Sequence, residues 1–113
     1  MAGSEDPRLV ELMKICEVVI ERDFAPCGLR DQVTERIKEL FAEWQRRYEQ
    51  AIREGRTIGD VKVIFLDLLR LVELARANSE RYGKPFCEYL KRALEKPYHE
   101  KGGLGYYSIR MWE

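Results

Sequence analysis

The chain has 113 residues, of which 45% are hydrophobic and 35% are charged. This length fits a single domain, and the hydrophobic share is sufficient for one core, which excludes a disordered protein. Lysine and arginine number 20, as do aspartate and glutamate, so the formal net charge is zero. A zero net charge argues against long-range attraction to nucleic acid or to an anionic membrane.

Charged residues interrupt every apolar stretch, so we expect no membrane-spanning helix and no membrane partner. The N-terminal residues contain no basic region followed by an apolar run, so we expect no secretory signal. The three cysteines, Cys16, Cys27 and Cys87, form no Cys-x-x-Cys pair, and their odd number predicts reduced thiols in the cytoplasm. Even with His99 they lack the spacing of a structural zinc site, so we predict neither a metal nor a cofactor.

The first predicted helix begins at Asp6, a capping residue, and Pro7, which suits the first helical position. Apolar residues then follow at steps of three and four: Leu9, Leu12, Met13, Cys16, Val19 and Ile20. Three more apolar residues widen this face: Val10, Ile15 and Val18. A helix with so much apolar circumference is expected to be covered from two sides. It is predicted to end near Pro26 and Gly28.

The second predicted helix has the clearest amphipathic pattern and ends at Gly55, a natural left-handed stop. Its apolar stripe consists of Val33, Ile37, Leu40, Phe41, Trp44, Tyr48, Ala51 and Ile52. Because Trp44 and Tyr48 lie on this stripe, we predict that they pack in the core.

The third predicted helix follows Thr57 and Asp60, which resemble a capping box, and ends at Gly83. Apolar residues occupy most of its circumference over residues 61–74, so we expect it to be the central helix. A fourth helix is predicted between Pro85 and Pro97. The sequence therefore predicts an all-α fold, a compact bundle of about four helices formed by residues 1–101.

Residues 102–113 are predicted to form a C-terminal aromatic tail after a glycine-rich hinge. The β-prone residues and Gly105 oppose a helix here and favour a short strand with Tyr107, Ile109 and Met111 on one side. So much apolar surface needs a cover, and two alternatives remain open: the tail folds back across its own bundle, or it pairs with another copy or a partner. The predicted partner-binding residues are Tyr106, Tyr107, Ile109, Met111 and Trp112.

Arg92 and His99 are the only candidates for catalytic residues. Their spacing, Arg-x6-His near the end of a helical bundle, resembles that of HEPN-type ribonucleases, in which such a pair acts on the RNA phosphodiester. This resemblance implies a ribonuclease, with His99 as the general base. The simpler interpretation is a solvent-exposed arginine and a loop histidine.

Residues 60–96 resemble ribbon-helix-helix DNA-binding proteins. The segment "DVKVIF" matches the strand of that family, and "PFCEYLKRALEK" is similar to its second helix. The resemblance implies nucleic-acid binding, alone or as a helical subunit of a nucleoprotein complex, with Lys62 as the base-reading side chain.

The leading functional prediction is a small, non-enzymatic, cytoplasmic interaction module or assembly subunit that associates with itself. The aromatic tail and the broad apolar faces of the first and third helices motivate it, because four helices seldom bury this much apolar surface alone. Nucleic-acid binding and ribonuclease activity are the alternatives.

Overall fold

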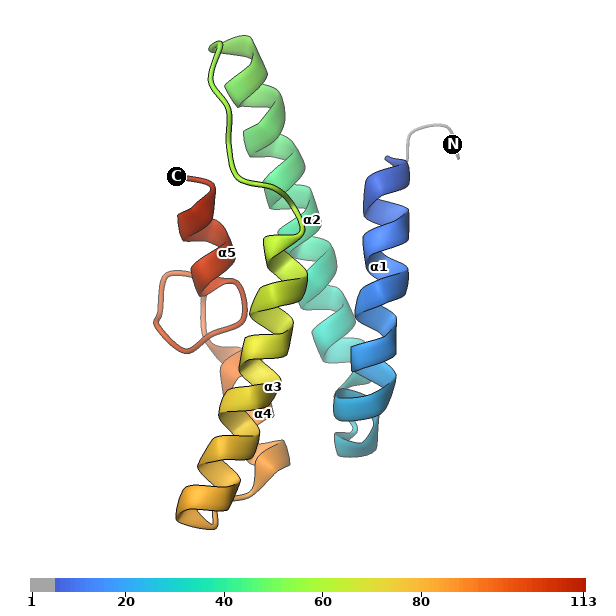
Figure 1. The fold of residues 1–113 in the computed structure, drawn as a ribbon, viewed down its shortest axis with the longest axis vertical. Coiled ribbons are helices and arrows are strands. Elements are labelled where there is room, and N and C mark those ends of the chain that lie inside the picture. The colour runs from blue at the N-terminus through green and yellow to red at the C-terminus, as the bar shows by residue number, and fades with distance from the viewer. Residues whose placement is uncertain (1–5) are drawn as a thin grey trace.

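A computed structural model describes residues 6–113, and in this part of the chain all regular elements are helical (Figure 1). The elements are α1 (Pro7–Val19), the π-helical turn η2 (Ile20–Phe24), the 3-10 turn η3 (Ala25–Cys27), α2 (Arg30–Arg53), α3 (Val63–Tyr82), α4 (Phe86–Glu95) and α5 (Tyr106–Met111). The predicted all-α fold is confirmed. The molecule measures 49 × 28 × 17 Å, so it is elongated and only about two helices thick.

Helix α1 begins as predicted, with the Asp6 carboxylate accepting a hydrogen bond from the Arg8 backbone N–H at 2.9 Å. It continues into η2, where the buried Asp23 carboxylate bonds the Arg76 guanidinium of α3 at 2.8 Å. Gly28 then adopts a left-handed φ of 74°, which turns the chain into α2. The π turn therefore aligns a buried charge with α3 before the chain reverses.

Helix α2 lies behind α1 and α3 in Figure 1 and buries most of the predicted apolar stripe, although Ile52 is exposed and Tyr48 is half-buried. Trp44 is only 3% exposed, its indole N–H donates to the Gly59 carbonyl at 2.9 Å, and its ring stacks on Tyr48 with centroids 4.8 Å apart. The core placement predicted for both aromatic residues is confirmed. Gly55, with φ of 71°, follows the helix as expected.

The start of α3 differs from the prediction. No side chain caps the helix, and the Asp60 carboxylate instead accepts a hydrogen bond from the Lys62 backbone N–H at 2.8 Å, within a turn that precedes Val63. The predicted capping box is therefore wrong. The strand expected over residues 60–65 is also absent, because Val63–Phe65 already form the first turn of α3. Helix α3 contacts α1, α4 and α5, which confirms its predicted central position.

The short strand predicted for the tail is wrong, because Tyr106–Met111 form α5. Gly105 precedes the helix with φ of 110°, and a Cβ atom there would lie 2.9 Å from side-chain atoms of both Leu40 and Tyr98. Only glycine satisfies this backbone angle and this space. The adjacent Leu104 is fully buried, so the predicted hinge is a packed connection in this structure.

Candidate functional site

In this structure the tail folds back across its own bundle, the first of the two alternatives left by the sequence, and pairing of the tail with another copy or a partner stays a prediction. Ile109 is 8% exposed and Trp112 is 2% exposed, and both belong to the core shared by α1, α2, α3 and α4. The Trp112 indole N–H donates to the Asp60 carbonyl at 3.3 Å. These two side chains are therefore used within the chain.

Three of the five predicted partner-binding residues retain accessible surface. Met111 is 60% exposed, whereas Tyr106 and Tyr107 are half-buried. The guanidinium of Arg70 lies 4.2 Å from the centre of the Tyr107 ring, and that of Arg110 lies 4.3 Å from the Tyr106 ring. Their role in partner binding stays a prediction, and the fold restricts it to a small patch.

Asp67 fixes the tail to α3. Its carboxylate, 5% exposed, accepts hydrogen bonds from the backbone N–H groups of Gly105 at 2.9 Å and Ser108 at 3.4 Å, and from the Ser108 hydroxyl at 3.2 Å. Burial raises the pKa of Asp67 above its usual value, although these hydrogen bonds oppose the shift. No local sequence pattern indicates this interaction, since the partners are about forty residues apart.

Arg92 and His99 are not assembled into a catalytic pair in the described residues. Arg92 lies on α4 and bonds Glu88 at 3.2 Å, while His99 is exposed beyond the end of the helix at Glu95. Within the described range, residues 6–113, no hydrogen bond or ion pair joins Arg92 to His99. The ribonuclease interpretation stays a prediction without a formed site to support it.

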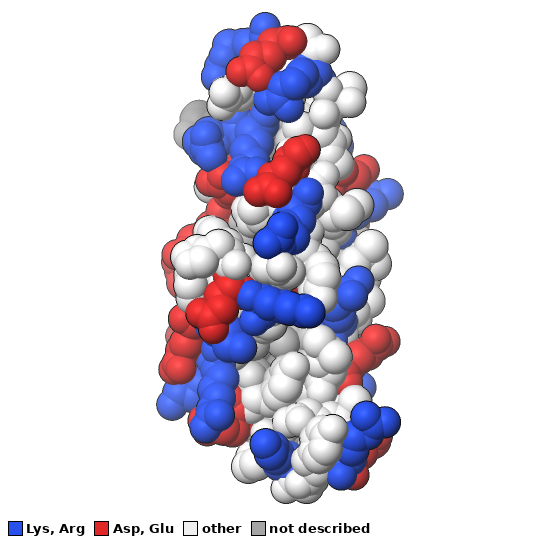
Figure 2. All heavy atoms as spheres, turned by 90° about the vertical axis from the view of Figure 1, so that its left-hand side faces the viewer, with Lys and Arg blue, Asp and Glu red and all other residues white. Residues whose placement is uncertain are grey.

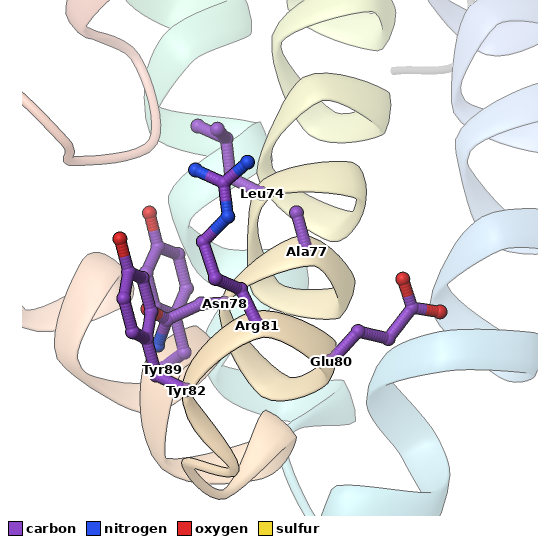
Figure 3. Close-up of a pocket in the computed structure, with 7 residues that line it drawn as sticks. All are labelled: Leu74, Ala77, Asn78, Glu80, Arg81, Tyr82 and Tyr89. Atoms are coloured by element: carbon purple, nitrogen blue, oxygen red, sulfur yellow. The ribbon is translucent and has the colours of Figure 1, made fainter.

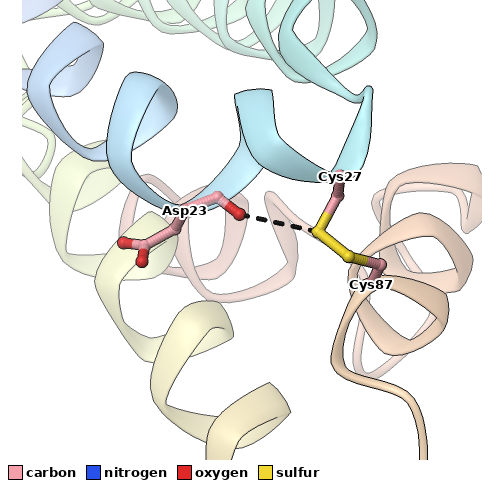
Figure 4. Close-up of a disulfide and its surroundings, with 3 residues drawn as sticks. All are labelled: Asp23, Cys27 and Cys87. Atoms are coloured by element: carbon pink, nitrogen blue, oxygen red, sulfur yellow. Dashed lines mark hydrogen bonds between the residues drawn. A yellow bond between two sulfur atoms is a disulfide. The ribbon is translucent and has the colours of Figure 1, made fainter.

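The cysteines differ from the sequence prediction. Cys27 and Cys87 form a disulfide that joins the end of η3 to the start of α4, so the prediction of reduced thiols is wrong for this pair (Figure 4). Cys16 is a buried free thiol, and burial raises its pKa to about 12. No cluster of potential metal ligands occurs in residues 6–113. The cytoplasmic location stays a prediction, and the disulfide removes the argument that was based on reduced thiols.

An apolar groove lies between α1 and the start of α3 and encloses about 520 Å³. Its apolar lining consists of Leu12, Ile15, Val61, Phe65 and Leu66. Ile15 is 43% exposed and Leu66 is 58% exposed, and Val18, one turn beyond Ile15, is 64% exposed. We call this surface the α1–α3 face. It contains Ile15 and Val18, two of the three excess apolar residues of the first helix, whereas Val10 lines a separate hollow beside α2.

Charged residues of both signs border the α1–α3 face. Arg8 and Glu11 come from α1, and Asp60 and Lys62 lie at the start of α3. Arg8 already pairs with Asp6 at 2.8 Å. Within residues 6–113, Glu11 and Lys62 form no ion pair, so both charges are available to a molecule that covers the groove.

Comparison of the chain with models of known protein families, with curated proteins and with solved structures finds no match. Within residues 6–113, no helix combines the length and the apolar character needed to cross a bilayer. The function must therefore be argued from the surfaces of this molecule.

Proposed function

We propose that the protein is a small, non-enzymatic interaction module that associates with itself through the α1–α3 face. The observation that carries this proposal is the exposure of Ile15, Val18 and Leu66 on adjoining helix surfaces beside an apolar groove. Contiguous exposed apolar residues with a charged border are typical of protein interfaces.

The charges at the border favour a second copy of the same chain as the partner. Helices α1 and α3 run in the same direction (Figure 1). A two-fold axis parallel to them would place α1 of one copy against α3 of the other, so that Glu11 meets Lys62 twice by symmetry. Such an interface uses the same apolar patch on both copies and places opposite charges against each other.

The expected affinity is modest. Full burial of a large apolar side chain contributes about 1.5–3 kcal/mol, and these three residues are already roughly half-buried. Two copies together would gain about 6 kcal/mol from them, against a substantial loss of rotational and translational freedom. The two ion pairs add about 1–2 kcal/mol, so about 4 kcal/mol remains after the lowest entropy cost, which corresponds to a dissociation constant on the order of 1 mM.

Sedimentation velocity over a dilution series tests this proposal. We expect the wild-type protein to be monomeric at about 1 µM and partly dimeric at about 500 µM. Leu66→Glu should abolish the dimer, because it introduces an unpaired charge into the interface. The matched control is Ile52→Glu on α2, since Ile52 and Leu66 are both 58% exposed and Ile52 lies outside the groove.

Charge reversal tests the two-fold arrangement. Glu11→Lys and Lys62→Glu should each weaken the dimer, and the double variant should restore it. A wild-type protein that stays monomeric throughout the dilution series would contradict the proposal. So would an Ile52→Glu variant that dissociates as readily as Leu66→Glu.

A further inference from the structure

Two adjoining hollows lie on the side of α3 that faces α4, away from the α1–α3 face. One encloses about 530 Å³ and its lining includes Leu74, Arg81 and Tyr82, and the other encloses about 520 Å³ and its lining includes Lys84, Arg92 and Lys96. Asn78 and Tyr89 line both hollows, so the two adjoin at these side chains. We call the two hollows together the Tyr82–Tyr89 groove.

Two tyrosine rings border this groove. Gly83 ends α3 with a left-handed φ of 65°, and Pro85 starts α4, so Tyr82 and Tyr89 come to the same surface from two helices. Tyr82 is 63% exposed, and Figure 3 shows both hydroxyls pointing in the same direction. An aromatic ring this exposed contributes little to the core and offers surface on which a planar ligand can stack, whereas Tyr89 is half-buried against the core.

The charge around the groove is more positive than that of the whole chain. Arg81, Lys84, Arg92 and Lys96 line it, against Glu80 and Glu88. Figure 3 shows Glu80 pointing away from the tyrosines, while Arg81 extends along their side of α3. Glu88 and Arg92 pair with each other, and Lys96 pairs with Glu100. Arg81 and Lys84 are therefore the groove cations that form no ion pair within residues 6–113.

Further cations lie beyond the groove on the same side of the molecule. Figure 2 views the side on which α5 lies, and its surface shows more lysine and arginine than aspartate and glutamate, with uncharged surface between them. A chain of negative charges that crosses the groove would therefore meet cations along its path.

We infer that the Tyr82–Tyr89 groove binds single-stranded nucleic acid, with bases stacked on the tyrosine rings and phosphates beside Arg81 and Lys84. Exposed aromatic rings interleaved with cations are the features that bind unpaired nucleotides without strict sequence preference. A duplex does not fit this chemistry, because its bases are already stacked. The site is separate from the "DVKVIF" segment, and it does not depend on self-association through the α1–α3 face.

Fluorescence anisotropy with labelled 12-nucleotide oligo-U and oligo-dT at low salt tests the inference. We expect the protein to bind both oligo-U and oligo-dT, and to bind a hairpin duplex more weakly. With about three phosphate contacts, the logarithm of the affinity should fall with the logarithm of salt concentration with a slope of about −2. Tyr82→Leu should weaken binding about tenfold, whereas Tyr82→Phe, which keeps the ring, should not.

A second pair of variants separates the phosphate contacts from the overall charge. Lys84→Gln should weaken binding and reduce the salt dependence. Arg53→Gln, the same charge change at an exposed position of α2, should do neither. Circular dichroism checks that each variant is folded. The inference is overturned if neither oligonucleotide binds or if the duplex binds as well as the single strands. It is also overturned if Tyr82→Leu binds like the wild type.

Discussion

Asp67 shows how a single buried carboxylate organises the end of the chain. Its oxygen accepts hydrogen bonds from the backbone N–H groups of Gly105 and Ser108, which would otherwise be buried without partners, and from the Ser108 hydroxyl, which also lies 3.2 Å from the Val63 carbonyl oxygen. Burial nevertheless raises its pKa, which means that ionised Asp67 is less favourable in the folded protein than in the unfolded chain.

The sign of this shift leads to a prediction about pH. The stabilising contribution of protonated Asp67 is fully present below the unfolded pKa of about 4 and is lost as pH rises through the higher folded pKa. Relative to Asp67→Asn, whose amide does not titrate, the wild-type protein should therefore gain unfolding free energy as pH falls from 7 to 4. Urea denaturation of both proteins at each pH measures the difference. A difference that shrinks on acidification would show that the hydrogen bonds outweigh the cost of burial.

Among the elements, α5 is the one that sequence patterns failed to predict. The six-residue segment Tyr106–Met111 is too short to be a stable helix alone, and its residues favour a strand. The helix forms because Asp67 binds its first turn and because Ile109 and Trp112 reach the core. These are long-range contacts, which local propensity does not contain.

The longer helices could be predicted because each carries its own apolar period and stop signals, such as Gly55 and Gly83. The α1–α3 face was foreseen only in part. The excess apolar residues of α1 indicated that one side lacks a cover, but the side that stays open depends on how α1 packs against α2 and α3. The Tyr82–Tyr89 groove likewise needs the turn at Gly83, which brings two helices together.

The contact between α5 and the loop before α3 is tight enough to test by adding one methyl group. A Cβ atom on Gly59 would lie 2.7 Å from the Met111 carbonyl oxygen, so Gly59→Ala must displace the end of α5 or the loop. We expect a loss of about 1–3 kcal/mol in unfolding free energy, and a red shift of tryptophan fluorescence because the Trp112 side chain becomes more exposed to solvent. Gly55→Ala, where no atom lies within 4 Å but φ is 71°, introduces backbone strain without a clash and should leave the tryptophan fluorescence unchanged. Unchanged fluorescence in Gly59→Ala would contradict this account of the contact.

At the scale of the whole molecule, the Cys27–Cys87 disulfide closes a loop with a sequence separation of 60 residues. A thin molecule of 17 Å has little interior, so a cross-link that restricts the unfolded chain should contribute noticeably to stability.

Reduction of the disulfide should therefore lower the unfolding free energy by about 2–4 kcal/mol, close to the chain-entropy estimate for a loop of this length. Thermal denaturation with and without dithiothreitol measures this effect. The double variant Cys27→Ser/Cys87→Ser should be as unstable as the reduced protein and insensitive to dithiothreitol. If thiol alkylation of the unreduced, unfolded protein labels all three cysteines, the disulfide does not form.

The same cross-link also determines how the chain would bear mechanical load. Helices α2 and α3 lie between Cys27 and Cys87, whereas α1 and α5 lie outside that span and both contact α3. Tension applied at the two termini would pass through the sulfur–sulfur bond, so the enclosed segment could not be pulled straight. Only the flanking helices would detach and extend. The disulfide would keep the segment between Cys27 and Cys87 from contributing its extended length of about 200 Å.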